Sequence, residues 1–201
     1  MSDPKIRSVV DAVTAKRSTA DGGQESLLSL GYSHVGIDDG WQACGTGWDG
    51  SFHAQDGTPL VNRSIFPDLK SLVDYGHGKG VKMGWYDDNC ICMDSYKLRA
   101  NASWAERAYQ GDVKQLYDAG FDGIKIDNCG DDDGSGFKSR AAHINASGHP
   151  LLIENSNQGN GHGPPRGLPN DTHWCNFNFF RALIESKPHT TRECCSCLAS
   201  D

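Results

Sequence analysis

Residues 120–130 read Gly-Phe-Asp-Gly-Ile-Lys-Ile-Asp-Asn-Cys-Gly, and this stretch sets the fold that the sequence predicts. Side chains alternate across a β-strand, so Lys125 and Asp127 share one face, while Ile124 and Ile126 share the other. In a parallel α/β sheet the apolar face packs under helices, which leaves the lysine and the aspartate on the face that lines a barrel interior or a cleft. Asp127 ends the strand, at the edge where such folds place their chemistry.

Two further stretches repeat this arrangement. Residues 33–39 (Ser-His-Val-Gly-Ile-Asp-Asp) and 81–88 (Val-Lys-Met-Gly-Trp-Tyr-Asp-Asp) both alternate apolar with polar or small side chains before two consecutive aspartates. One Lys-Asp pair at a strand end is often only a structural ion pair. Three strands that all end in carboxylates indicate one polar pocket instead. The residues expected to converge on it are Asp38, Asp39, Tyr86, Lys125, Asp127 and Glu154.

Helical patterns separate the strands. Pro-Asp at 67–68 is typical of a helix start and Gly80 of its end, and Ser-x-x-Glu at 103–106 is a capping box. Residues 1–22 are polar, with one weakly periodic segment at 6–13 that is a candidate helix, and with no expected strand. Alternating helices and strands imply right-handed βαβ units in a parallel sheet. We expect helices at residues 24–30, 67–79, 103–119 and 134–148, and a fourth strand at 150–154.

The composition argues against several classes of protein. The 201-residue chain has a formal net charge of -7, whereas a nucleic-acid-binding surface needs clustered Lys and Arg. No run of 18 apolar residues predicts a transmembrane helix, and the first residues lack the apolar core of a signal peptide. The eight cysteines nevertheless suit an oxidising compartment. Four glycosylation sequons suit it too, at Asn62, Asn101, Asn145 and Asn170.

No cofactor or metal motif is complete. Residues 36–40 follow a strand, but they are acidic and lack the glycine spacing of a dinucleotide-binding turn. Residues 131–134 (Asp-Asp-Asp-Gly) look like part of a calcium loop, yet no glutamate stands where the twelve-residue pattern requires it. Cys194, Cys195 and Cys197 lack the paired spacing of a zinc site. We therefore expect no cofactor and no metal.

Four motifs in one order point to a known family. They are Gly-Ile-Asp-Asp-Gly-Trp at 36–41, Phe-Pro-Asp-Leu-Lys-Ser-Leu-Val-Asp-Tyr-Gly-His-Gly-Lys-Gly at 66–80, Met-Gly-Trp-Tyr at 83–86 and Lys-Ile-Asp-Asn-Cys at 125–129. From about residue 25 to Arg181 the chain resembles the melibiase-type α-galactosidases of glycoside hydrolase family 27, clan D. The resemblance implies a (β/α)8 TIM barrel with a trailing β-domain, and hydrolysis of terminal α-galactosides with retention of configuration.

The resemblance also implies a role for each matched residue. Asp127 is similar to the family's nucleophile and Lys125 to a ligand of sugar hydroxyls, while Asp38 and Asp39 resemble the pair that holds the galactose hydroxyls. A retaining glycosidase needs one ionised carboxylate to attack the sugar and one protonated acid about 5 Å away. Lys125, on the same face as Asp127, is expected to keep that carboxylate ionised. The other matched pocket residues are Tyr86, Glu154 and Arg181.

Cys129 is similar to a family cysteine that is disulfide-bonded to the loop after the preceding strand. That loop offers two partners, Cys90 and Cys92, and the sequence leaves the choice open. In a reducing compartment all three would instead be free thiols.

The chain departs from the family pattern in two places. Nothing in residues 1–30 resembles the Gly-Trp-Asn-Ser-Trp motif of the family's first strand. The family's acid/base is an aspartate four residues after the arginine that Arg181 matches, and here that position is Glu185. We therefore expect an α/β fold, an incomplete (β/α)8 TIM barrel without the first strand, the last strands and the β-domain. Its expected divisions are a partly disordered polar leader at 1–23, a partial barrel at 24–181 and an aberrant cysteine-containing tail at 182–201.

The leading interpretation is an α-galactosidase whose partner is an α-galactoside, free or on a glycan, and whose full-length parent is secreted or lysosomal or vacuolar. Three alternatives stay open. α-N-Acetylgalactosaminidases are close relatives that differ around the 2-substituent of the sugar. A non-catalytic galactose-binding protein would keep Asp38, Asp39 and Lys125 without an acid. A truncated product with little activity is the third.

Overall fold

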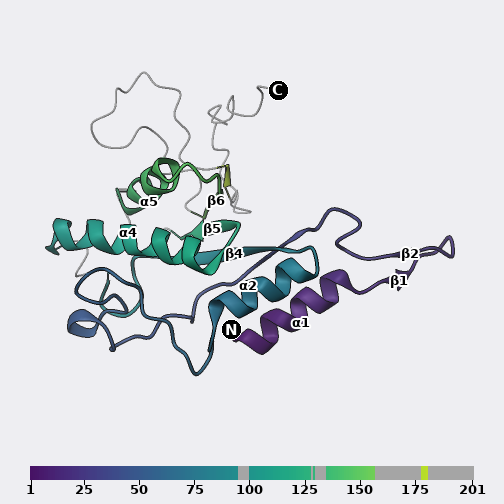
Figure 1. The fold of residues 1–201 in the computed structure, drawn as a ribbon, viewed down its shortest axis with the longest axis horizontal. Coiled ribbons are helices and arrows are strands. Elements are labelled where there is room, and N and C mark those ends of the chain that lie inside the picture. Colours follow the sequence, from purple (N-terminus) through teal and green to yellow (C-terminus); the bar gives the residue numbers. More distant parts are fainter. Residues whose placement is uncertain (95–99, 128, 130–134, 157–177, 181–201) are drawn as a thin grey trace, which may run out of the picture.

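The computed structural model describes residues 1–94, 100–127, 129, 135–156 and 178–180 (Figure 1). Its helices are α1 (Asp3–Thr14), α2 (Leu69–Gly78), α4 (Ala102–Ala119) and α5 (Ser135–Ala146), with a short 3-10 helix at Trp48–Gly50. Its strands are β1 (Arg17–Ser18), β2 (Gln24–Glu25), β3 (His34–Gly36), β4 (Lys82–Asp87), β5 (Gly123–Ile126), β6 (Leu152–Asn155) and β7 (Phe179–Phe180).

Strands β3 to β7 form one parallel sheet in the order of the chain, which confirms the predicted βαβ alternation. The register pairs Gly84 with both Gly36 and Gly123 on the neighbouring strands, and it pairs Lys125 with both Tyr86 and Glu154. Residues paired across parallel strands point to the same face. One face of the sheet therefore carries a row of small residues next to a row of polar ones.

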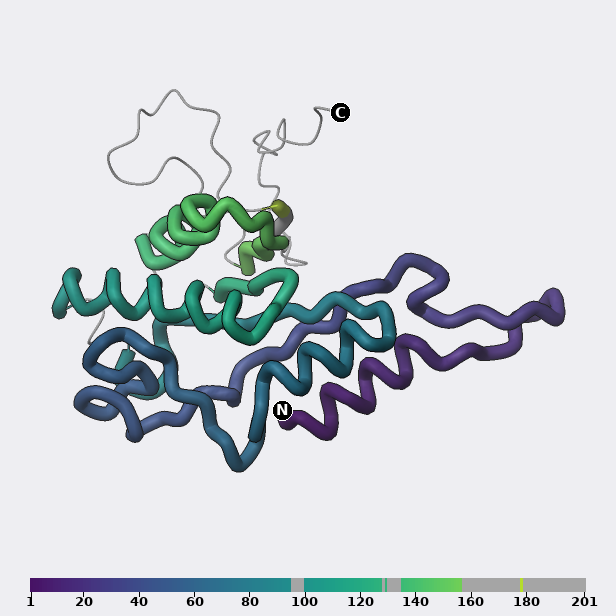
Figure 2. Tube along the Cα trace, in the orientation of Figure 1, coloured from purple at the N-terminus to yellow at the C-terminus, as the bar shows by residue number. Residues whose placement is uncertain are grey.

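The opposite face carries the hydrophobic core. Met83 and Trp85 of β4 and Ile124 of β5 are almost fully buried, and α2 packs against β4 and α4 on that side. Helix α1 lies against α2, and α5 against α4, so the helices cover the sheet as neighbouring pairs (Figures 1 and 2). This is the layering expected when βαβ units wind in one sense around a parallel sheet.

Side-chain caps fix where the helices of the sheet layer begin. The carboxylate of Asp68 accepts the backbone N–H of Ser71 at the start of α2, as its position after Pro67 predicts. Helix α4 begins earlier than the expected capping box, because the side chain of Asn101 accepts the backbone N–H of Trp104. Gly120 ends α4 in the left-handed conformation, with φ of 84°, which favours glycine.

The N-terminal segment is more ordered than the expected polar leader, and the candidate helix at 6–13 is confirmed as part of α1. Residues 3–14 form α1, and Ile6 and Val10 are buried in the same core as the sheet. The antiparallel pair β1–β2 follows and projects from the body of the molecule (Figure 2). A structured pair of strands thus precedes residue 33, where the sequence predicted none.

The helix predicted at residues 24–30 is wrong. The side chains of Ser26 and Ser29 bond each other's backbone N–H groups, and such local bonds compete with helical ones. Of the three leucines in this segment, Leu28 packs half-buried against the core, whereas Leu27 and Leu30 are exposed by 44% and 62%. With one leucine partly buried, a short helix gains little from packing.

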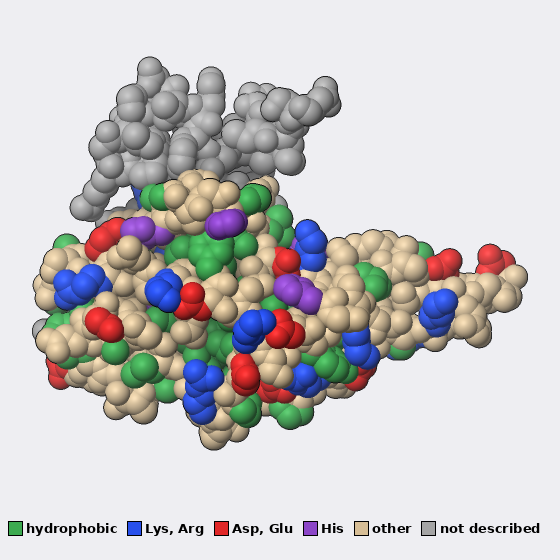
Figure 3. Space-filling model, in the orientation of Figure 1, with side chains coloured by type: hydrophobic (Ala, Val, Ile, Leu, Met, Phe, Trp, Pro, Cys, Tyr) green, Lys and Arg blue, Asp and Glu red, His purple; other side chains and the backbone are tan. Residues whose placement is uncertain are grey.

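Charges of both signs are interspersed over the surface that Figure 3 shows, without a continuous basic patch. None of the helices in the described part of the chain has both the length and the hydropathy needed to cross a bilayer.

The first prediction is that Gly111→Ala loses stability, because the backbone of Gly57 lies very close to Gly111. Gly111 lies within α4, where alanine normally favours the helix by about 1 kcal/mol. A Cβ at this position would lie 2.0 Å from the carbonyl oxygen of Gly57, and backbone cannot yield as a flexible side chain does. We expect the clash to outweigh the propensity and to destabilise the fold by about 1–3 kcal/mol in urea unfolding.

Gly78→Ala in α2 is the matched control, since nothing lies within 4 Å of the added Cβ. It should leave stability unchanged or raise it slightly. A Gly111→Ala variant at least as stable as the wild type would contradict the close packing of α4 on the loop at residue 57.

Candidate active site

A cavity lies along the face of the sheet that the helices do not cover. Gly36, Gly84 and Gly123, which are in register, line it and leave space that side chains would fill. Its volume is about 350 Å³, within the range of small-molecule sites. Three of the expected polar residues line it as well, namely Asp38, Lys125 and Glu154.

An ion pair joins two of these strands across the cavity. The ammonium group of Lys125 donates a hydrogen bond of 2.7 Å to Oδ2 of Asp38. Glu154 is the register partner of Lys125 on β6. Lys125 also lies over the ring of Tyr86, with Nζ 4.9 Å from the ring centroid. One cation thus holds a carboxylate and an aromatic ring from two neighbouring strands.

Tyr86 connects this pair to Asp127. Its hydroxyl donates to Oδ2 of Asp127 over 3.3 Å. Burial, and then the negative charges of Asp88, Asp127 and Asp39, raise the pKa of Tyr86 above its usual value. The hydroxyl therefore keeps its proton and can donate to a carboxylate or to a sugar oxygen.

The structure brings together most of the residues predicted for the site. Asp38, Tyr86, Lys125 and Asp127 are linked by the contacts above, and Asp39 is close enough to act on Tyr86. Glu154 lines the cavity with Asp38 and Lys125, whereas Tyr86, Asp39 and Asp127 do not line it. The expected partner of Lys125 differs, because its ammonium group pairs with Asp38, whereas Asp127 receives the hydroxyl of Tyr86. Arg181 and Glu185 lie outside the described residues, as do residues 182–201.

Two disulfides tie together the loops at this edge of the sheet. Of the two partners that the sequence left open, Cys129 pairs with Cys90. Cys92 pairs with Cys44 in the long loop after β3, a bond that the sequence did not suggest. The loops that follow β3, β4 and β5 are therefore covalently connected in series.

Backbone bonds add to this connection beside Asp127. The N–H of Asp127 donates to the carbonyl of Asp87 at 2.8 Å, and the N–H of Asn89 donates to the carbonyl of Cys129 at 2.9 Å. Between them, Asp88 accepts the N–H groups of Cys90 and Ile91. The residues that follow Tyr86 thus hold the residues around Asp127 in place.

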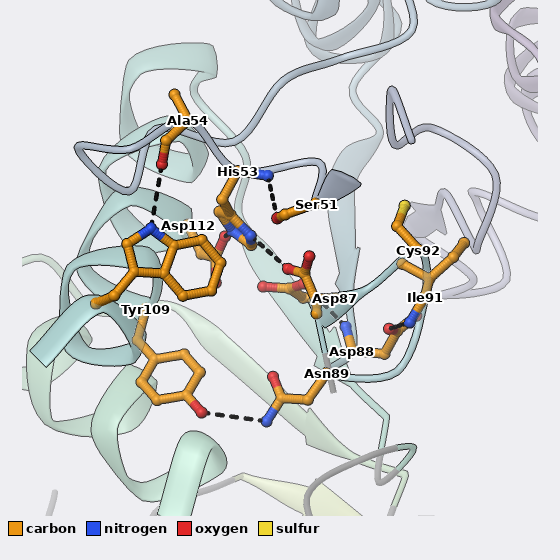
Figure 4. A network of polar contacts seen from close by, with 12 residues as sticks. Ser51, His53, Ala54, Asp87, Asp88, Asn89, Ile91, Cys92, Tyr109 and Asp112 are labelled. Carbon is orange, nitrogen blue, oxygen red and sulfur yellow. Dashed lines mark hydrogen bonds and ion pairs between the residues drawn. The ribbon is translucent and has the colours of Figure 1, made fainter. Parts of the chain in front are cut away.

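A buried polar cluster on the other face of the sheet is absent from the sequence prediction. We call it the His53 cluster, and Figure 4 shows much of it. The ring of His53 bonds Asp94 through Nδ1 at 2.6 Å and Asp112 through Nε2 at 2.7 Å. The guanidinium of Arg140, from α5, bonds Asp112 and lies 2.8 Å from Asp87. These side chains are all fully buried.

The charges of neighbouring side chains decide which groups of the His53 cluster are ionised. Burial disfavours a charge on His53, but Asp112 and Asp94 outweigh it and raise its pKa to about 10. Burial would also raise the pKa of Asp112, yet His53 and Arg140 lower it to about 2. Burial raises the pKa of Asp87 well above its usual value, against the opposing effect of Arg140. An imidazolium, a carboxylate and a guanidinium are therefore packed together out of water.

Comparison with known proteins assigns the family. A family model described as alpha galactosidase A (Melibiase_2) matches residues 9–158, about three quarters of the chain. The chain belongs to this family. The melibiase model ends beyond β6, so it includes Asp38, Tyr86, Lys125, Asp127 and Glu154.

The similar curated melibiases are much longer than this chain. The alpha-galactosidase of Oryza sativa subsp. japonica is 37% identical over 117 residues, which are 57% of this chain and 25% of the rice protein. The alpha-N-acetylgalactosaminidase of Gallus gallus is 28% identical over 157 residues, 75% of this chain and 35% of the chicken protein. The chain thus spans about a quarter to a third of the length of these relatives.

Solved melibiase-like structures share the fold. An alpha-galactosidase from Saccharomyces cerevisiae, solved with raffinose, superimposes with a TM-score of 0.56 at 18% identity, covering 80% of this chain and 33% of the yeast chain. A GH27 β-L-arabinopyranosidase from Geobacillus stearothermophilus gives 0.57 at 13% identity, covering 78% and 44%. The predicted fold class, an incomplete TIM barrel with parallel strands, is confirmed by this likeness and by the five-stranded parallel sheet.

Proposed function

We propose that this chain carries the nucleophile half of a retaining α-galactosidase site. The observation that supports it is the placement of Asp127 at the carboxyl end of β5, in contact with the Tyr86 hydroxyl and next to the Asp38–Lys125 pair. The substrate is a terminal α-galactoside of an oligosaccharide or glycoconjugate. The sugar lies at the carboxyl edge of the sheet, at the end of the cavity next to Asp127, where Asp38, Lys125 and Glu154 of the cavity wall and the adjacent Asp39 bind its hydroxyls.

In the proposed reaction the carboxylate of Asp127 attacks the anomeric carbon, and the bond to the leaving oxygen breaks with transfer of a proton to that oxygen. The product is a glycosyl ester of Asp127, which water then hydrolyses. The Tyr86 hydroxyl donates a hydrogen bond to the attacking carboxylate and so orients it. Lys125 and Asp38 fix the sugar relative to Asp127.

The leaving group needs an acid, and Glu185 is the residue at the family's acid/base position. Its side chain is one methylene longer than the family's aspartate, and its flanking residues do not match the family pattern. We infer that this 201-residue chain protonates leaving groups poorly. Loss of a general acid costs about 10²–10⁴-fold in rate for substrates that require protonation.

The second prediction concerns the leaving group. We expect slow release of phenolate from an activated aryl α-galactoside, whose leaving group needs little protonation, and release of galactose from melibiose at least about 10²-fold slower. Initial rates for both sugars, measured on the same purified chain, test this ratio. Rapid melibiose turnover would contradict the inference and make Glu185 the working acid.

Galactose calorimetry and initial rates on aryl glycosides distinguish the alternative functions. A galactose-binding protein would bind galactose in calorimetry and release no phenolate from either substrate. An α-N-acetylgalactosaminidase would prefer the aryl N-acetylgalactosaminide over the galactoside.

We also place the protein in an oxidising compartment, secreted or lysosomal or vacuolar, because disulfides such as Cys44–Cys92 and Cys90–Cys129 persist there.

A further inference from the structure

We propose that Arg140 is a positioning residue for this reaction, because it bonds Asp87 and Asn89. Both belong to residues 86–89, the end of β4 and the start of the loop that follows it, which we call the β4 loop; it includes Tyr86 and the backbone partner of Asp127. The inference rests on the proposed function and adds a residue to it. Arg140 comes from α5 and approaches from the outer face of the sheet, so it does not touch the sugar cavity. Its action on the site would be indirect.

Arg140 contacts two residues of the β4 loop, Asp87 and Asn89, one on each side of Asp88 in the sequence. Nη1 donates to the side-chain oxygen of Asn89 at 2.9 Å, and Nε lies 2.8 Å from the carboxylate of Asp87. Its guanidinium also lies 4.6 Å from the ring centroid of Tyr109. Figure 4 shows Asp87, Asn89 and Tyr109 close together, with the hydrogen bond from Asn89 to the Tyr109 hydroxyl. A planar guanidinium can make these bonds at once, whereas an ammonium group cannot reproduce the fork.

The guanidinium of Arg140 is also held by Asp112 of the His53 cluster. Nε and Nη2 of Arg140 lie 2.9 Å and 2.8 Å from Oδ2 of Asp112, which comes from α4. Asp112 is held in turn by His53. The guanidinium therefore joins two helices to the loop, and it has no freedom to move without breaking buried bonds.

The loop side chains held by Arg140 belong to the residues whose backbone groups bond the nucleophile segment. The carbonyl of Asp87 accepts the N–H of Asp127, and the N–H of Asn89 donates to Cys129. Tyr86, directly before Asp87, places its hydroxyl on Asp127. A shift of this loop would therefore move the Asp127 carboxylate and the Tyr86 hydroxyl together, and displacements of about 1 Å can cost about 10²-fold in rate.

The test is the rate at which a 2-deoxy-2-fluoro aryl α-galactoside labels the chain, followed by intact mass. For Arg140→Lys we expect a labelling rate about 10- to 100-fold below that of the wild type. The dissociation constant for galactose should stay within about threefold, because the cavity residues are unchanged. Labelling at the wild-type rate by a folded Arg140→Lys chain would overturn the proposal, and so would an equal loss in galactose binding.

His143→Gln is the matched control. His143 lies on the same helix and bonds Glu106 of α4, but it makes none of the loop contacts. It should label at the wild-type rate. If Arg140→Lys does not fold, Asn89→Ala decides the question, because it removes the hydrogen bond from Arg140 to Asn89 and leaves Arg140 in contact with Asp87 and Asp112. Wild-type labelling by Asn89→Ala would then overturn the proposal.

A ¹⁹F NMR measurement that needs no catalysis tests the positioning role of Arg140 independently of the proposed function. The chain has six tyrosines, so ¹⁹F spectra of 3-fluorotyrosine-labelled protein are simple, and Tyr86→Phe identifies one resonance. That resonance should shift in Arg140→Lys and stay in place in His143→Gln. If wild type is never labelled by the galactoside but the resonance shifts, only the proposed function fails. An unshifted resonance overturns the positioning role.

Discussion

Asp127→Asn is expected to lower the rate of phenolate release from an aryl α-galactoside by about 10⁴-fold or more, as removal of the nucleophile does in other covalent mechanisms. The amide has nearly the shape of the carboxylate, so it can still accept the Tyr86 hydroxyl, but it cannot attack the anomeric carbon. The galactose dissociation constant should change little by comparison. Pre-steady-state release of phenolate measures the attack itself.

Asp118→Asn is the control for this substitution. Asp118 lies on α4, its side chain is 64% exposed, and its ion pair with Lys114 is at the surface. It should react like the wild type. An Asp127→Asn chain that retained more than about a tenth of the wild-type burst would show that another carboxylate attacks the sugar.

Asp112→Ala is expected to destabilise the fold by about 3–5 kcal/mol, the usual cost of removing one partner from a buried ion pair. The carboxylate of Asp112 bonds two buried cations, His53 and Arg140, and its removal leaves His53 with only Asp94 and Arg140 with only Asp87 as acidic neighbours among the described residues. Urea unfolding followed by tryptophan fluorescence measures the change. Asp118→Ala on the same helix is the control, and it should cost less than about 1 kcal/mol because its pair is exposed.

The shifted pKa values of Asp112 and His53 predict how the stability of the fold depends on pH. The pKa of Asp112 is lowered to about 2 in the fold, so its contribution is complete above about pH 4 and is lost as the pH falls toward 2. The pKa of His53 is raised to about 10, so its contribution is complete below pH 6.5 and is lost as the pH rises toward 10. The wild type should therefore lose stability toward both extremes. Asp112→Ala should have a shallower slope on the acid side.

If Asp112→Ala unfolded at the same urea concentration as the wild type, the His53 cluster would not be a buried ionic network. A rise in stability from pH 7 to pH 10 would contradict the raised pKa of His53.

The sheet and the predicted site could be read from the sequence because both depend on a period of two. Alternation placed Lys125 and Asp127 on one face of β5, and the same alternation in β4 put Tyr86 beside them. The order of the strands then followed from the helices between them. Local signals were less reliable. Side-chain bonds between Ser26 and Ser29 stand where the sequence predicted a helix at residues 24–30. Asn101 caps α4 two residues before Ser103, where the sequence predicted a capping box.

The His53 cluster could not be predicted in this way. His53 bonds Asp94 and Asp112 across 41 and 59 residues, and Arg140 bonds Asn89 across 51. Such residues are usually solvated, so no pattern in the sequence marks them as buried. Their burial depends on the fold that brings α4, α5 and two loops together. The partner of Cys129 was likewise a matter of loop geometry, because Cys90 and Cys92 are only two residues apart.

The most direct measurement is the site of the covalent label. The purified chain is incubated with a 2-deoxy-2-fluoro aryl α-galactoside, weighed intact, and then digested and sequenced by mass spectrometry. We expect one fluorogalactosyl group per chain, attached to Asp127 through an ester that Asp127→Asn cannot form. A folded chain that takes up no label, or one labelled at another carboxylate such as Glu154, would contradict the account.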